Sequence, residues 1–318
     1  MMDISVLNTA RTLAFLSVFL ALLTTLPCAS YSRTPGASPG QCIDAQVIAI
    51  QGGWIANPTR RPLSNWSCVS AGEEIAPADD SLKGQITVIY HRGAKPPHTI
   101  KCASRAQCRN AYRVEALLTT RNDSRSNVDQ ILDFFFSIFT ENKSQPVQGI
   151  LQGMLRGDVR PRPALTCSVG QRVQLEDMLK PGRYNLRVRA LNEQAEDVTW
   201  QAKNAVDGQT YAGAAWASLI GSERDHTSLV MSQPLREPAF YAVDTWPVGT
   251  NEPDASVWVL IAPEALCEPL HDSFEQAVNF TKTWPKDTPS EAVMNFRLRY
   301  LQGLAAQPDK APIGKAHR

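Results

Sequence analysis

The chain has 318 residues, of which 43% are hydrophobic and 20% charged, and its formal net charge is +1. This length predicts about two domains, and the composition is that of an ordinary globular protein. The nearly balanced charge excludes a global field that would attract nucleic acid or anionic lipid, so we expect no nucleic-acid partner.

The amino terminus has the residue order of a secretory signal peptide. Arg11 precedes an apolar run, Leu13–Leu23, which gives way to the small residues after Cys28. The run is shorter than the ~20 residues that span a bilayer, so we predict a cleaved leader over residues 1–30. Lipidation of Cys28, as in bacterial lipoproteins, is the alternative that would attach the protein to a membrane. Residues 31–41 are rich in serine, proline and glycine, which predicts a flexible spacer.

Residues 42–116 have the pattern of a small β domain. Val47–Ile50 is a short apolar run that ends at two glycines, and Gln85–Tyr90 is a β-branched run that ends near Gly93. Thr99–Cys102 follows closely enough to pair with the second run as a hairpin. Several short strands separated by turn residues predict a small barrel or sandwich.

One pattern of short segments extends over residues 47–102 of this domain: Val47–Trp54, Leu63, Val69–Ile75, Gly84–Tyr90 and Gly93. This pattern resembles the FecR-type periplasmic signalling domain and, equally, other β-rich envelope modules of bacteria. It implies a protein that relays signals by binding protein partners, with no catalytic residues to carry over. The cysteines of this chain depart from that family's pattern.

Residues 125–160 predict a helical connector. Asn127 and Gln130 have the spacing of a capping box, and apolar residues then occur on nearly every side of the predicted helix up to Phe139. Apolar residues within 147–155 recur with helical periodicity and predict a second short helix.

Residues 163–268 predict a second β domain. Arg183–Ala190 alternates apolar and polar residues, which indicates a half-buried strand whose outer face is basic. Leu229–Met231, Phe240–Val243 and Val257–Ala262 predict further strands, the last apolar enough to be central. We expect a β-sandwich, and the segment leading into the basic strand is similar to Ig-like modules.

The arginines of that strand have two interpretations. Arg183, Arg187 and Arg189 share one strand face, where guanidinium groups could hold a sulfated or phosphorylated polymer. A soluble outer face that discourages edge pairing is the interpretation we favour.

Residues 270–306 predict a C-terminal helical pair, and residues 307–318 a disordered tail. We expect a helix over Asp272–Thr283, a bend at Trp284, and a second helix capped by Thr288. Apolar residues line one face of the second helix, and its polar residues Asn295, Arg299 and Gln302 lie off that stripe. The fold class is therefore mostly β with helices (α+β): a small β barrel or sandwich, a helical connector, a β-sandwich and a helical pair.

Removal of the leader with Cys28 leaves an even set of cysteines, typical of disulfides in an exported chain: Cys42, Cys68, Cys102, Cys108, Cys167 and Cys267. Of the fifteen pairings possible, we prefer Cys42–Cys68, Cys102–Cys108 and Cys167–Cys267. Zinc would need closer Cys/His spacing than the chain offers. His91 and His98 flank one turn and could share a metal with a carboxylate, but solvated side chains are the favoured interpretation, and we expect no cofactor or metal.

No established catalytic motif is present. Ser222, Asp225 and His226 lie close in sequence and allow the hypothesis of a hydrolase, and Trp66 and Trp246, if exposed, would allow polysaccharide binding. We expect instead a secreted or periplasmic, non-enzymatic binding or scaffold protein of the cell envelope. Its partner would be another envelope or secreted protein.

Overall fold

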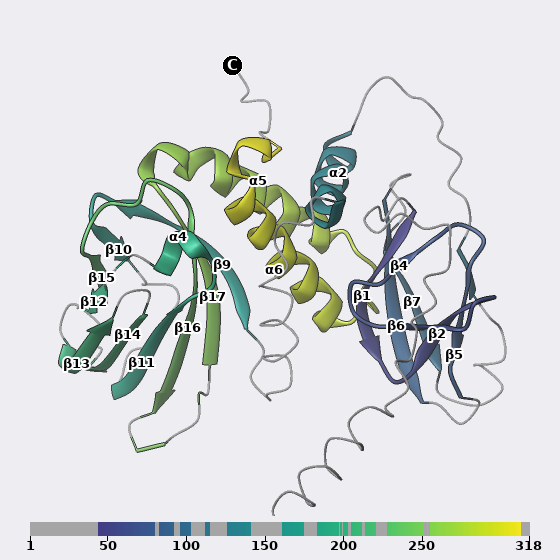
Figure 1. Ribbon diagram of the computed structural model, residues 1–318, viewed down its shortest axis with the longest axis horizontal. Helices are drawn as coiled ribbons and strands as arrows, with labels where there is room; N and C mark the ends of the chain where they lie inside the picture. The colour runs from purple at the N-terminus through teal and green to yellow at the C-terminus, as the bar shows by residue number, and fades with distance from the viewer. Residues whose placement is uncertain are drawn as a thin grey trace, which may run out of the picture. The chain divides into compact units, whose positions relative to one another are not determined.

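The computed structural model describes residues 44–79, 83–91, 96–102, 112–114, 126–140, 161–174, 183–196, 198, 200–202, 205–211, 214–220, 228–247, 249–250, 253 and 255–312 (Figure 1). All of them belong to one compact unit, Gly40–Arg318. The predicted leader and spacer, Cys28, Cys42, Cys108 and the predicted helix within 147–155 lie outside the described residues. The fold is a mixed α+β fold rich in strands, as predicted.

The first β domain consists of two four-stranded sheets. One has the order β4-β1-β6-β7 and the other β3-β2-β5-β8. The strands are β1 (Ala45–Gln51), β2 (Trp54–Asn57), β3 (Arg61–Leu63), β4 (Cys68–Val69), β5 (Glu74–Pro77), β6 (Gly84–Tyr90), β7 (His98–Cys102) and β8 (Tyr112–Arg113). The predicted hairpin is confirmed, because β6 and β7 pair antiparallel with Thr87 opposite Thr99.

The two sheets enclose one hydrophobic core, and a second core covers the outer face of β1 and β6. Val47, Trp54 and Ile86 lie in the first core. A β-bulge in β1 shifts the register between Val47 and Ala49, so Ile48 and Ala49 both lie in the second core. A bulge places two residues opposite one partner residue, which explains why consecutive side chains share that face.

The second β domain is built from a single nine-stranded sheet of order β12-β15-β10-β9-β17-β16-β11-β14-β13. The strands are β9 (Arg162–Val169), β10 (Arg172–Gln174), β11 (Arg183–Ala190), β12 (Trp200–Ala202), β13 (Ala205–Tyr211), β14 (Ala214–Ile220), β15 (Ser228–Met231), β16 (Ala239–Pro247) and β17 (Ala255–Ala262). Neighbouring strands run antiparallel, except that β9 and β17 are parallel.

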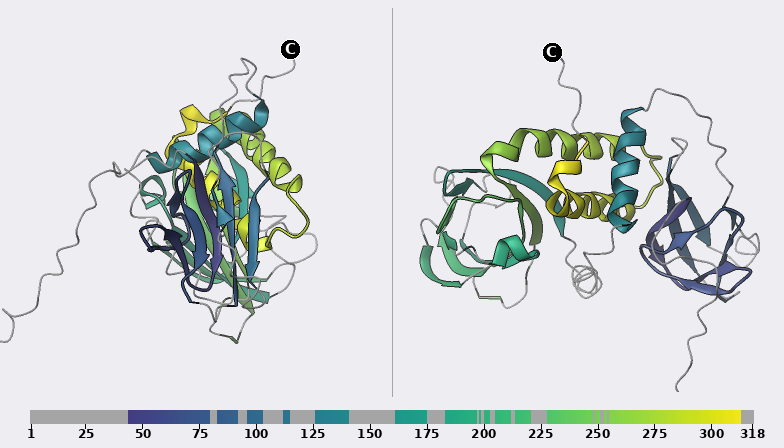
Figure 2. Two further views of the ribbon diagram at one scale, coloured as in Figure 1. Left: turned by 90° about the vertical axis from the view of Figure 1, so that its right-hand side faces the viewer. Right: turned by 45° about the horizontal axis from the view of Figure 1, so that its top comes forward.

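This sheet curls until its two edges meet, as Figure 2 shows. The edge strand β12 contacts β13 and β14 at the opposite edge. The two facing layers expected of a β-sandwich are therefore parts of one coiled sheet, a shape that the right-handed twist of long strands favours. Inside the curl, Leu186, Trp200, Tyr241 and Val259 are buried in one core.

Strands β16 and β17 are covered on both faces. Tyr241 and Val259 face the interior of the curl, whereas Phe240 and Trp258 lie in the core formed with the helices. Strands buried on both sides become nearly continuous apolar runs, which explains the sequence of β17 and confirms its predicted central position.

The helices are α2 (Asn127–Thr140), α4 (Glu193–Glu196), α5 (Glu264–Lys282), α6 (Ser290–Ala306) and the 3₁₀ turn η2 (Pro308–Lys310). Helix α5 begins eight residues before the predicted start at Asp272, and it includes Pro269. A proline inside a helix removes one backbone hydrogen bond, and α5 tolerates it. Among the described residues, no helix is both long enough and apolar enough to cross a membrane.

Helix ends differ slightly from the predicted caps. Ser126, rather than Asn127, caps α2: its Oγ accepts a hydrogen bond from the Asp129 amide, and its amide donates to the Asp129 carboxylate. Thr288 makes no capping bond, since α6 begins after Pro289. The prediction of a disordered tail is wrong for residues 307–312, because η2 continues the fold and Ala311 is buried in the helical core; residues 313–318 lie outside the described residues.

Helix α6 is buried on nearly all sides. Residues Phe296, Tyr300 and Leu304 are fully buried, as the apolar stripe predicts. Asn295, Arg299 and Gln302 are buried too, with exposed fractions of 2–6%. Burial lowers the pKa of the Arg299 guanidinium to about 10, and its Nη1 donates to the side-chain oxygen of Gln302. The polar side of this helix thus faces other parts of the fold.

Candidate binding site on the nine-stranded sheet

Charged and polar side chains from three adjacent strands meet on the outer face of the nine-stranded sheet. Arg187 of β11 lies opposite Asp244 of β16, and Asp244 lies opposite Ser256 of β17. Arg189 follows two positions after Arg187 and therefore shares its face. Leu186 and Val188, which alternate with the arginines, are fully buried inside the curl and fix the direction of the strand.

The Asp244 carboxylate accepts hydrogen bonds from the other polar side chains of this group. Its Oδ2 accepts hydrogen bonds from Nε and Nη2 of Arg187 at 3.2 and 2.8 Å, and from Nε and Nη2 of Arg189 at 3.2 and 3.0 Å. Its Oδ1 accepts a bond of 2.8 Å from the Ser256 hydroxyl. The Asp244 side chain is only 5% exposed, whereas those of Arg187 and Arg189 are 44% and 34% exposed.

An aromatic ring adds a further contact to the exposed arginine. The guanidinium carbon of Arg187 lies 5.7 Å from the centre of the Trp246 ring. Such a cation–π contact restrains the guanidinium plane and adds attraction. We call Arg187, Arg189, Asp244, Ser256 and Trp246 the arginine cluster.

The arginine cluster is suited to binding an anion. Two guanidinium groups share one carboxylate, and the Arg187 and Arg189 side chains remain 44% and 34% exposed. Arginine does not release its proton near neutral pH, so the cluster offers hydrogen-bond donors and charge rather than acid–base chemistry.

The favoured outer-face interpretation holds in part, because Arg187 and Arg189 are partly exposed on that face. The arginines do not guard a sheet edge, since β11 lies between β16 and β14. Arg187 and Arg189 both form ion pairs with Asp244, a residue for which the sequence predicted no role. A signal was present, because Asp244 is the one charged residue in the otherwise apolar strand Ala239–Pro247. A carboxylate in such a strand requires a cation or several donors beside it.

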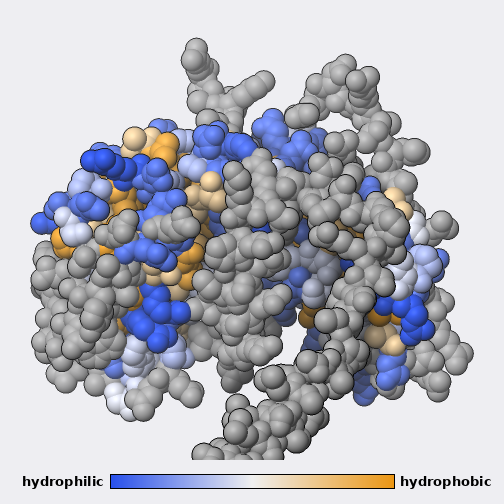
Figure 3. Space-filling model, in the orientation of Figure 1, coloured by the Kyte–Doolittle hydropathy of each residue, from blue (hydrophilic) through white to orange (hydrophobic). Residues whose placement is uncertain are grey.

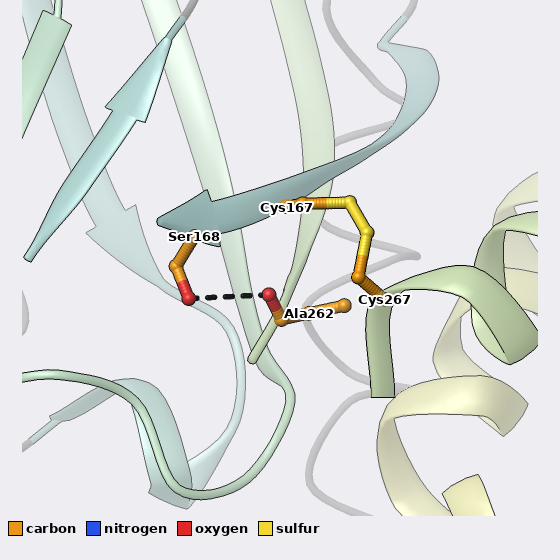
Figure 4. The surroundings of a disulfide bond; sticks show 4 residues. All are labelled: Cys167, Ser168, Ala262 and Cys267. Atoms are coloured by element: carbon orange, nitrogen blue, oxygen red, sulfur yellow. Dashed lines mark hydrogen bonds between the residues drawn. A yellow bond between two sulfur atoms is a disulfide. The ribbon is translucent and has the colours of Figure 1, made fainter. Parts of the chain in front are cut away.

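The preferred disulfide between Cys167 and Cys267 is confirmed. It joins β9 to α5 across a sequence separation of 100, with the two Cα atoms 5.5 Å apart. Figure 4 shows the bond beside a hydrogen bond of 3.2 Å from the Ser168 hydroxyl to the carbonyl oxygen of Ala262. The disulfide and the hydrogen bond both connect the end of β9 to the end of β17 and the helix that follows it.

The remaining cysteines are partly described. Cys68 and Cys102 are disulfide-bonded. Cys42 and Cys108 lie outside the described residues, so the pairings Cys42–Cys68 and Cys102–Cys108 stay predictions.

The two histidines considered for a shared metal have separate partners. His91 lies 3.3 Å from the Asp133 carboxylate and stacks on Phe136 of α2. His98 stacks on Tyr112, and burial lowers its pKa. Within the described part of the chain, one group could hold a metal by geometry: the exposed His271, Asp272 and Glu275 of α5. Exposed acidic groups of this kind are common on helices, and we assign no ion to it.

The tryptophans considered as carbohydrate platforms are buried. Trp66 is 7% and Trp246 9% exposed, so neither offers a ring face for a sugar to stack on. The alternative of carbohydrate binding through these two rings is therefore not supported. Ser222, Asp225 and His226 lie outside the described residues, and the hydrolase hypothesis stays untested.

A shallow cleft of about 280 Å³ lies beside α2. Its lining consists of Gln130, Asp133, Phe134, Ser137, Lys310 and Pro312. The Asp133 carboxylate and the Lys310 ammonium group carry opposite charges, so the charge of the cleft favours neither anionic nor cationic ligands. The arginine cluster, with two partly exposed guanidinium groups side by side, has a clearer preference for anions.

No family model, curated protein or solved structure significantly matches this chain.

Proposed function

We propose that this protein is an exported, non-enzymatic binding protein of the cell envelope that acts through contacts with another protein. The observation that carries the proposal is the arginine cluster. It presents two guanidinium groups at the surface, both held by the Asp244 carboxylate. Electrostatic groups held in this way give a binding surface its specificity and its rate of association.

The rest of the described surface favours recognition through charge. Val169 is the one large hydrophobic side chain that is highly exposed in the described part of the chain. In Figure 3 the coloured surface is largely hydrophilic, with smaller hydrophobic areas between the charged residues. A partner that docks on this surface would therefore rely on polar contacts and ion pairs.

Disulfide bonding supports export. Disulfides persist in oxidising compartments, and Cys68, Cys102, Cys167 and Cys267 are all bonded. The signal-peptide order of residues 11–30 is independent support for the same route. The resemblance of residues 47–102 to the FecR-type domain agrees with a periplasmic protein that binds other proteins.

The experiment is crosslinking in the native envelope. The full-length chain with a C-terminal tag is crosslinked in intact cells, purified under denaturing conditions, and analysed by mass spectrometry. We expect one envelope or secreted protein to be enriched reproducibly over a control exported protein that carries the same tag. Recovery of the uncrosslinked chain alone, over a range of crosslinker lengths, would contradict the proposal.

A further inference from the structure

We draw no further inference here: the strongest candidate, the exposed acidic side-chain cluster of α5 around Glu268, Asp272 and Glu275, carries nothing because no feature of the described residues shows what would bind there.

Discussion

The side-chain amide of Asn295 donates a hydrogen bond of 2.8 Å to the backbone carbonyl oxygen of Ile48, 247 positions earlier in the chain. Ile48 occupies the bulge of β1, where the pairing with β6 is interrupted. A bulge residue has no regular partner on the neighbouring strand. The Asn295 side chain from α6 therefore supplies the hydrogen bond that the buried Ile48 carbonyl does not receive within the sheet. The same bond links α6 to the first β domain.

Replacing Asn295 should therefore destabilise the fold. We expect N295A to lower the free energy of unfolding by about 1–3 kcal/mol, because it leaves a buried acceptor without a partner. The matched control is N279A, which removes an exposed asparagine of α5 and should change stability by less than about 0.5 kcal/mol. Urea denaturation followed by circular dichroism measures both, and equal effects would contradict the role of the bond.

Asp244 should be the most sensitive residue of the arginine cluster. We expect D244A to lower the free energy of unfolding by about 2–4 kcal/mol, since two guanidinium groups would lose the carboxylate that they share, an effect partly relieved by solvent. R187Q should cost less than about 1 kcal/mol because Arg187 is half exposed. The control D272A removes an exposed carboxylate of α5. A D244A protein as stable as D272A in urea would refute this account.

The disulfide between β9 and α5 should supply a large share of the stability. In the chain-entropy treatment, a bridge closing a loop of this length contributes about 4–5 kcal/mol, and native bridges commonly about 2–5 kcal/mol. The double variant C167S/C267S should accordingly unfold at a much lower urea concentration. An unchanged unfolding midpoint would show that the link is dispensable.

Tyr300 should make the fold sensitive to alkaline pH. Burial raises the pKa of its hydroxyl, which shares a hydrogen bond of 3.0 Å with Ser273. An unfolded tyrosine releases its proton at about pH 10. Above that pH the folded state binds more protons than the unfolded state, so the stability due to Tyr300 is complete below about pH 10 and is lost as the pH rises further.

The measurement compares urea midpoints of wild type and Y300F at about pH 9 and pH 11, on either side of the ordinary tyrosine pKa. The midpoint should fall less steeply in Y300F. Tyr241, whose pKa burial also raises, and Arg299, whose lowered pKa acts with the opposite sign, are present in both proteins. Their contributions cancel in the difference, and parallel slopes would exclude a role for Tyr300.

Gly303 allows α6 to approach α2 closely. A Cβ atom at this position would overlap with the end of the Ile138 side chain. G303A should therefore destabilise by about 1–3 kcal/mol through overpacking, despite the better helix propensity of alanine. The double variant G303A/I138V, which removes the Ile138 Cδ1 atom, should recover part of the loss in thermal unfolding. A G303A protein at least as stable as the wild type would contradict the close approach.

Local patterns in the sequence were sufficient for the elements whose signals lie within a few residues. Alternation predicted β11, and an apolar run predicted β17 as a central strand. A capping-box pair followed by apolar residues predicted α2, and capping residues with a one-sided apolar stripe predicted α6. The preference for a Cys167–Cys267 bridge was also correct. The start of α5 was missed because Pro269 resembles a helix boundary, although the fold tolerates it inside the helix.

The sequence by itself therefore determined the α+β class, the helices α2, α5 and α6, fewer than half of the strands, and the basic face of β11. Only the tertiary structure decided that β16 lies beside β11, which brings Asp244 to Arg187 and Arg189 and turns a row of arginines into one cluster. It also decided the burial of Trp246 and the bond from Asn295 to Ile48. Strand order and register depend on contacts between residues far apart in the chain. Such contacts produce no periodic pattern in the sequence around either residue, so the sequence alone does not predict them.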